Sequence, residues 1–360
     1  MGKRLLATTA ALCLLFTGTA VAEPQQVDRK IVQEGLDELV ALGFATGTQA
    51  RLTDGRTRFS ARSGSAEIDR PRPVPLNGRF RAGSITKTFT STVVLQLAGE
   101  GEVELDAPVD RYLPGLVDRR ITVRQLLQMT AGLFNYTNAL KFDPQGFEAI
   151  RYRSWTPEEL VAISTARPLD FEPGTRWNYS NTNYVVLSML IEKVTGRSYE
   201  RAVEQRVLKP LRLTETRFPG DDVEIRGPHA RSYGVVDGRT VDTTRWNPSV
   251  FKGAGDVITT TRDLDTFYGA LLTGELLEPA EQTELTRTTA VSTDYGLGIF
   301  VDKAPCGTTI IGHTGGVPGF ASYAYSTPDL RRRVELSITL GTGTADPTPA
   351  FAKLINEIFC

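Results

Sequence analysis

Residues 81–90 read RAGSITKTFT and place Ser84 three residues before Lys87. From Ile85 to Leu97, apolar side chains recur at helical spacing and cover nearly the whole circumference, which predicts a buried helix. A lysine in the first turn of such a helix is unfavourable, because burial disfavours an ammonium group and the helix start is already partly positive. The presence of Lys87 therefore points to a specific role.

Ser84 has two interpretations. It can cap the helix, a common role for serine, but that role leaves Lys87 unexplained. Alternatively Ser84 is a nucleophile, because a lysine one turn further on lies on the same helix face and can take the hydroxyl proton. A second pair, Ser249 and Lys252 in PSVFK, has the same spacing but is followed at once by glycines rather than by a helix.

The composition is that of a globular protein. The chain has 360 residues, 40% of them hydrophobic and 23% charged, with a formal net charge of −1. No basic field indicates a nucleic-acid partner. We expect one catalytic unit over residues 23–360, and the sequence favours a monomer.

The first 22 residues have the pattern of a cleavable secretory signal. Lys3 and Arg4 precede an apolar run over residues 5–16, and small residues end at Ala22. The run is too short to span a membrane, and no other apolar run is long enough. We therefore expect a soluble protein that is secreted after cleavage near Ala22.

Export makes the cysteines informative. Removal of Cys13 with the signal leaves Cys306 and Cys360, an even pair in an oxidising compartment. A disulfide between them would close a loop of about 55 residues, and the alternative is two unpaired thiols.

Extended patterns near both ends of the chain enclose a helical middle. Residues 28–42 predict an amphipathic helix, and residues 48–52 and 57–61 predict a hairpin around Asp54-Gly55. Extended runs return in the last hundred residues before a final helix at 349–359. We expect an α/β (α+β) fold: one sheet from residues 28–95 and 250–360, with a mainly helical insertion at 96–249.

A serine–histidine–aspartate triad is disfavoured. The only histidines are His229 and His313, and the sequence lacks a Gly-x-Ser-x-Gly elbow. So few histidines also argue against a histidine-rich metal site, and no cofactor is expected.

Two further motifs accompany the Ser84 stretch. RWNYSNTNY (176–184) places Tyr179 and Asn181 just before a predicted helix, and IGHTGGVPG (311–319) places His313 and Thr314 at the end of an extended run. Neither motif alone is strong evidence for a catalytic site, since NYTN (135–138) supplies a second Tyr-x-Asn. The three motifs together, in this order, are much more specific evidence.

The three motifs resemble those of the serine penicillin-binding and class C β-lactamase superfamily. The likeness covers nearly the whole mature chain and is strongest to secreted low-molecular-mass D-alanyl-D-alanine carboxypeptidases. The late cysteine pair fits the same group. The resemblance implies an antiparallel sheet flanked by helices, joined to a helical lobe, with the site between them.

The resemblance also implies a role for each motif residue. Ser84 would be acylated, Lys87 would be its proton partner, and Tyr179 would act as general base or shuttle. The backbone N–H groups of Ser84 and Gly316 would form the oxyanion hole. The other expected site residues are Asn181 for the substrate amide, His313 to tune Tyr179, Thr314 for a terminal carboxylate, and Gly315, Trp246 and Phe300 along the substrate site.

Two positions depart from the carboxypeptidase pattern. Gly316 replaces a threonine, and Phe300 stands where relatives commonly carry an arginine that pairs with the substrate carboxylate. Thr314, aided by Lys303, would then bind that carboxylate. Loss of a charge-assisted contact weakens the case for a carboxypeptidase acting on peptidoglycan stem peptides.

Three functions are compatible with these residues. The leading one is a secreted D-alanyl-D-alanine carboxypeptidase that also binds β-lactams. The second is an esterase, D-aminopeptidase or β-lactamase on the same fold, acting on another small acyl substrate. The third is a binder of cell-wall peptide or β-lactam without turnover, which would not need to keep a base.

Overall fold

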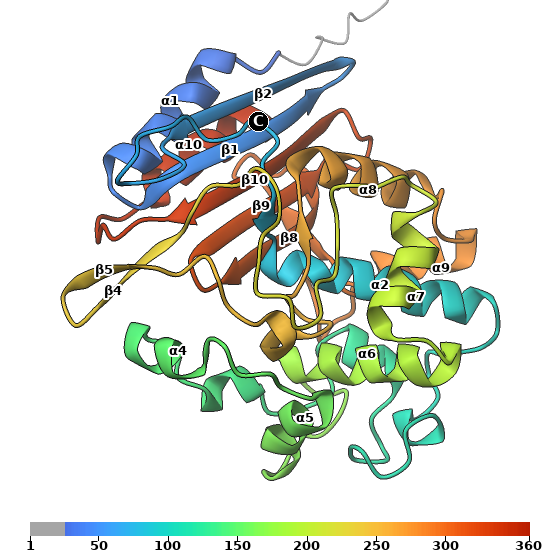
Figure 1. Cartoon of the computed structure of the whole chain (residues 1–360). Helices are drawn as coiled ribbons and strands as arrows, with labels where there is room; N and C mark the ends of the chain where they lie inside the picture. Colours follow the sequence, from blue (N-terminus) through green and yellow to red (C-terminus); the bar gives the residue numbers. More distant parts are fainter. Residues whose placement is uncertain (1–25) are drawn as a thin grey trace, which may run out of the picture.

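A computed structural model describes residues 26–360 (Figure 1), so the expected signal segment lies outside the described residues. A six-stranded antiparallel sheet runs in the order β2-β1-β10-β9-β8-β7. Its first two strands come from the start of the chain and the other four from the end. The strands are β1 (Ala45–Asp54), β2 (Thr57–Gly64), β7 (Phe300–Lys303), β8 (Thr309–Val317), β9 (Phe320–Ser326) and β10 (Arg332–Leu340).

Helices cover both faces of the sheet. The terminal helices α1 (Arg29–Ala41) and α10 (Thr348–Phe359) pack against each other and bury one apolar cluster on one face. Helix α8 (Thr261–Thr273) packs on strands β1, β9 and β10 from the other side. The predicted α/β (α+β) fold, with an antiparallel sheet flanked by helices, is confirmed.

A larger apolar cluster joins this second face to the helical region, which lies below the sheet in Figure 1. At its centre is α2 (Thr86–Gly99), buried nearly all round as predicted. The other α-helices are α3 (Val123–Leu127), α4 (Pro144–Ile150), α5 (Pro157–Thr165), α6 (Asn181–Thr195), α7 (Tyr199–Val203) and α9 (Pro279–Leu285).

Short elements complete the chain. The 3-10 turns are η1 (Gly83–Ile85), η2 (Val109–Arg111), η3 (Tyr136–Ala139) and η5 (Pro248–Phe251), and η4 (Glu204–Leu208) is π-helical. The remaining strands are β3 (Phe80–Arg81), β4 (Tyr233–Val236), β5 (Arg239–Asp242) and β6 (Ile258–Thr259).

Two local predictions were incomplete or wrong. The β4–β5 hairpin was not expected, although Asp237-Gly238 is a hairpin signal and both residues take positive φ. The extended run predicted from Tyr295 begins only at Phe300, because Gly298 adopts φ +81° and breaks the strand.

The predicted disulfide is confirmed. Cys306 and Cys360 are bonded, with their Cα atoms 5.8 Å apart, which ties the end of α10 to the turn between β7 and β8. Within residues 26–360, no helix combines the length and the apolar character needed to cross a bilayer.

Candidate active site

Ser84 lies in η1, directly before α2. The helix starts at Thr86, and no side chain caps its N-terminus, so capping does not account for Ser84. Gly83 adopts φ +55°, and a Cβ there would lie 2.7 Å from the backbone nitrogen of Gly316. The turn that carries Ser84 therefore rests against β8, with no side chain between the two backbones.

Lys87 is completely buried and points toward Ser84. Its Nζ donates to Ser84 Oγ at 3.0 Å, to Asn181 Oδ1 at 2.7 Å and to the carbonyl oxygen of Ala254 at 2.7 Å. Burial lowers the pKa of Lys87 well below its ordinary value, while the charge of Asp256 acts in the opposite direction. A buried lysine whose pKa is lowered gives up its proton more readily than an exposed one, so Lys87 is suited to act as a general base.

Tyr179 and Asn181 come from the loop that enters α6. Asn181 turns its oxygen to Lys87, and its Nδ2 donates to Thr137 Oγ1 at 3.2 Å. The Tyr179 ring lies 4.8 Å from Lys87 Nζ. Burial raises the pKa of Tyr179, and a hydrogen bond with Ser84 acts against this rise. Tyr179 is therefore a protonated phenol at rest.

His313 lies in the centre of β8 and is fully buried. Burial, with a smaller effect from Lys87, lowers the pKa of His313 to about 3, so the imidazole is neutral. Its Nδ1 lies 2.5 Å from the carbonyl oxygen of Thr314, which can only accept, so Nδ1 carries the proton. Its Nε2 then accepts from the hydroxyl of Tyr295 at 3.2 Å.

The second half of β8 forms an open edge beside Ser84. β7 pairs with β8 only over residues 309–312, so Thr314, Gly315 and Gly316 extend beyond its end. A Cβ at Gly315 would lie 1.8 Å from the carbonyl oxygen of Ala82, whereas one at Gly316 would meet nothing within 4 Å. Gly315 thus permits the close approach, and Gly316 faces open space.

Phe300 belongs to an aromatic group next to this edge. Its ring centroid lies 4.7 Å from that of Tyr295 and 5.0 Å from that of His313. Trp177 stacks at an angle against Tyr295 at 6.0 Å and against Tyr179 at 6.4 Å. Trp177, Tyr179 and Phe300 are partly exposed, so they form an apolar wall that a substrate can reach.

Two expected substrate contacts lie elsewhere. Trp246 is 1% exposed and packs under the guanidinium of Arg81 at 4.0 Å, so it is a core residue rather than a substrate contact. Lys303 pairs with Thr309, five residues along β8 from Thr314, or about 16 Å at strand spacing. Lys303 therefore cannot assist Thr314 in holding a carboxylate.

The second Ser-x-x-Lys pair (Ser249 and Lys252) and the second Tyr-x-Asn stretch (135–138) have structural roles. Ser249 Oγ accepts from the backbone of Trp155 at 2.9 Å, and Lys252 pairs with Glu192 at 2.9 Å and Glu200 at 3.2 Å. Tyr136 is buried and donates to the carbonyl oxygen of Val250. The structure brings together only the Ser84 set.

Sequence reasoning missed several contributors. Tyr295 orients His313, and its place in YGLGI together with its aromatic character could have indicated a buried site residue. Ala254 contributes only a backbone carbonyl, for which the sequence carries no signal.

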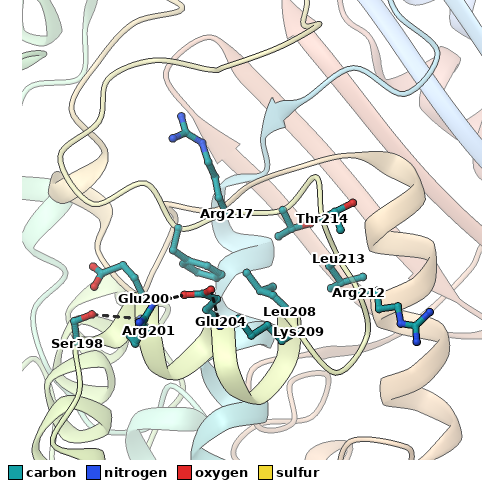
Figure 2. A pocket seen from close by; sticks show the side chains of 12 residues that line it. Ser198, Glu200, Arg201, Glu204, Leu208, Lys209, Arg212, Leu213, Thr214 and Arg217 are labelled. Carbon is teal, nitrogen blue, oxygen red and sulfur yellow. Dashed lines mark hydrogen bonds and ion pairs between the residues drawn. The ribbon is translucent and has the colours of Figure 1, made fainter.

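A surface cavity of about 630 Å³ lies apart from these residues, over α7, η4 and the loop that follows. Figure 2 shows its charged rim, including Glu200, Glu204 and Arg217. None of the predicted site residues lines it.

Comparisons with known proteins agree with this geometry. The model of the family described as Beta-lactamase matches residues 29–354. Penicillin-binding protein 4* of Bacillus subtilis is 27% identical over 331 residues, which are 86% of this chain and 71% of that protein. The chain spans about half the length of the next curated relatives.

Two solved structures are similar over most of the chain. A D-stereospecific amidohydrolase from Streptomyces sp. is 41% identical with a TM-score of 0.84, covering 92% of this chain and 99% of that one. A D-amino acid amidase from Ochrobactrum anthropi SV3, complexed with L-phenylalanine amide, is 26% identical with a TM-score of 0.78, covering 91% and 97%.

Proposed function

The chain belongs to the beta-lactamase family of serine hydrolases, and on that premise we propose that it cleaves amide or ester bonds of D-amino acid derivatives through an acyl-enzyme. The single observation that carries the substrate class is Phe300, which packs on Tyr295 and His313 where carboxypeptidase relatives commonly carry an arginine. An apolar ring at this place suits a substrate without a free carboxylate.

The acylation step uses the groups around Ser84. Lys87 takes the proton of Ser84 while Oγ attacks the substrate carbonyl carbon, and the oxyanion faces the N–H groups of Ser84 and Gly316. Tyr179, a protonated phenol, passes a proton to the leaving amine or alcohol and recovers one from Lys87. Water then attacks the ester on Ser84 and releases the acid.

The lowered pKa of Lys87 and the raised pKa of Tyr179 favour these roles, with Lys87 as proton acceptor and Tyr179 as proton donor. A general base works best when its pKa lies near the working pH. In this arrangement Lys87, rather than Tyr179, is the base that acts first, and Tyr179 is a proton shuttle.

A D-alanyl-D-alanine carboxypeptidase is the second candidate. The half-exposed Thr314 on the open edge of β8 favours it, because its hydroxyl can bind a terminal carboxylate. Export with cleavage near Ala22 is proposed for either activity, and the Cys306–Cys360 disulfide supports it.

The test is a direct comparison of substrates on the mature protein. We expect D-phenylalanine amide and a simple aryl ester to be hydrolysed with a higher kcat/KM than a peptide ending in D-alanyl-D-alanine, and the L-amide to react poorly. A clear preference for the free-acid peptide would favour the carboxypeptidase, and equal rates for the two enantiomers would contradict D-stereospecificity.

A further inference from the structure

A second cavity, of about 520 Å³, is lined by residues of α8 and of the strands β1, β2 and β10. Each of these four elements contributes one arginine to its wall: Arg51, Arg58, Arg333 and Arg262. The acidic residues of the wall are Asp265 and Glu275. None of the residues around Ser84 lines this cavity, so it is separate from the proposed active site.

The register of the sheet gathers three of these arginines. Thr53 of β1 lies opposite Arg58 of β2 on one side and opposite Arg333 of β10 on the other. Residues directly opposite each other on neighbouring strands point to the same face of a sheet. Arg51 precedes Thr53 by two residues on β1 and therefore shares that face. Three guanidinium groups thus project from one face of the sheet into the cavity.

Asp265 of α8 is the only carboxylate of the described residues that pairs with them. Its oxygens accept from Arg51 Nε at 3.0 Å and from Arg333 Nε and Nη2 at 3.0 and 2.5 Å, and Arg58 Nε lies 3.5 Å away. A carboxylate accepts about four hydrogen bonds and carries one charge. Asp265 is therefore fully occupied and leaves two of the three positive charges without compensation.

Several guanidinium N–H groups remain free to bind a ligand. In the part of the chain that the structure describes, Arg51 donates only through Nε, and no acceptor is found for Nη1 of Arg333. Arg262 is exposed at the rim, and within the same residues its guanidinium forms no ion pair. These groups are the donors that an anion in the cavity would use.

The neighbouring acidic residues do not supply the missing charge. Glu335 lies opposite Arg51 and is 1% exposed, and burial raises the pKa of its carboxyl group well above the ordinary value, so Glu335 is uncharged. Glu275 is exposed at the rim and accepts from Thr273 Oγ1 at 3.2 Å. Among residues 26–360 it forms no ion pair with the arginines of the cavity.

A glycine in the middle of α8 keeps Arg333 open to the cavity. Glycine is unfavourable inside a helix, and Gly269 has no positive φ that would require it. A Cβ at Gly269 would meet only the Arg333 guanidinium, at an ordinary contact distance of 3.9 Å, so packing does not require glycine either. The side chain of Arg333 is 8% exposed, and a larger residue at position 269 would cover it.

From this arginine cluster we propose that the cavity binds a phosphate group, held by Arg51, Arg58 and Arg333 with Arg262 at the rim. Guanidinium groups offer planar pairs of N–H donors that match phosphate oxygens. A phosphate monoester carries nearly two negative charges at neutral pH, which matches the two uncompensated positive charges beside Asp265. The cavity is much larger than one phosphate group, so it has room for the molecule that carries it.

The ligand is a soluble phosphate compound. A phosphate group at a bilayer surface offers the same chemistry, but Arg333 is recessed beneath α8, where a soluble anion reaches it more easily than a lipid headgroup does. This binding site is independent of the hydrolase activity proposed above.

The test is calorimetric titration of the mature protein with inorganic phosphate and with pyrophosphate. We expect both to bind, pyrophosphate more tightly, and the affinity to fall as the salt concentration rises. Acetate, which has one charge and two oxygens, should bind at least tenfold more weakly. Flotation with phosphatidylcholine vesicles, with and without phosphatidylglycerol, examines the lipid source.

Two exposed arginines provide the first variants. Arg58→Gln and Arg262→Gln should each weaken pyrophosphate binding about tenfold, because each removes a charge-assisted contact. Arg56→Gln is the matched control: Arg56 is exposed and two residues from Arg58, but it does not line the cavity. It removes the same charge and should keep the wild-type affinity.

Gly269→Leu tests the geometry without changing any charge. Its side chain should cover the Arg333 guanidinium and weaken pyrophosphate binding at least tenfold, while the melting temperature without ligand shows that the variant is folded.

Each outcome decides for or against the site. Binding that Arg58→Gln, Arg262→Gln or Gly269→Leu weakens and Arg56→Gln does not would support it. Absence of binding, or an equal loss in Arg56→Gln, would overturn it. Flotation with phosphatidylglycerol without binding of the soluble phosphates would also overturn it, in favour of a lipid surface.

Discussion

Lys87 Nζ donates a hydrogen bond to the carbonyl oxygen of Ala254, 167 residues further along the chain, at 2.7 Å. This bond joins α2 to the segment that leads into β6, and with the bonds to Ser84 and Asn181 it accounts for all three protons of a charged lysine. A neutral Lys87 has one proton fewer, so its lone pair can turn to Ser84. The resting hydrogen bonds therefore already place the base at the nucleophile.

The nucleophile is the first prediction. A penicillin or an aryl ester should add covalently to Ser84, and Ser84→Ala should abolish the adduct, because no other serine in the described chain has a buried lysine 3.0 Å from its hydroxyl. Ser249→Ala is the matched control and should keep the adduct. Mass mapping of the label to Ser249 would refute the assignment.

The second prediction concerns the proton-transfer groups. Lys87→Ala and Tyr179→Phe should each slow acylation by about a hundredfold or more, the usual contribution of general acid–base catalysis. Stopped-flow acylation measures the effect. Asn138→Ala, at the exposed asparagine of the second Tyr-x-Asn motif, should react at the wild-type rate. Near-normal acylation in Lys87→Ala or Tyr179→Phe would contradict the role given to that residue.

The third prediction is a pH dependence of stability from His313. Its folded-state pKa of about 3 lies below the unfolded value. The unfolded chain therefore binds more protons than the folded chain once the pH falls below about 6.5. The free energy of unfolding should decrease by about 1.2 kcal/mol between pH 6 and pH 5 from this group alone.

Urea unfolding at several pH values measures that slope. His313→Asn should remove the contribution and His229→Gln should retain it. Equal slopes in the wild type and His313→Asn would show that the imidazole is not held neutral in the fold.

The fourth prediction concerns substrate selection. Phe300→Arg with Gly316→Thr should shift the ratio of kcat/KM toward a free-acid D-alanyl-D-alanine peptide over the amide by about ten- to a hundredfold, as expected for one charge-assisted contact. Position 316 has room for the threonine. The single variants report each contribution, and a fall in the ratio for the double variant would contradict the role given to these positions.

The fifth prediction concerns the disulfide. Reduction, or Cys360→Ser, should lower the melting temperature, because the bond joins cysteines 54 positions apart in the sequence and contributes about 4 kcal/mol on the chain-entropy estimate. Calorimetry with and without reductant measures the loss. Two titratable thiols in exported protein would show that the bond does not form.

Local patterns were sufficient for the parts of the fold that depend on periodicity and turns. The buried circumference of α2 and the Asp54-Gly55 hairpin follow from side-chain spacing and glycine geometry. The start of β7 at Phe300 could not be predicted in this way, because the positive φ of Gly298 depends on its close packing against Ser91 and Tyr184.

Only those site residues could be predicted whose side chains belong to a recognisable sequence motif. Ser84, Lys87, Tyr179 and Asn181 lie together as expected. Trp246 did not reach the site, because whether a tryptophan lines a cleft or fills a core depends on what packs over it, here Arg81.

The pairing of β1 with β10 also bears on the order in which the chain can fold. Ala50 of β1 lies opposite Leu336 of β10. The edge of β1 that faces β10 therefore stays unpaired until β10, which lies in the last tenth of the sequence, has been synthesised. An exposed apolar edge is prone to aggregation during that interval. Truncation anywhere before β10 should therefore yield insoluble chains rather than a smaller folded unit.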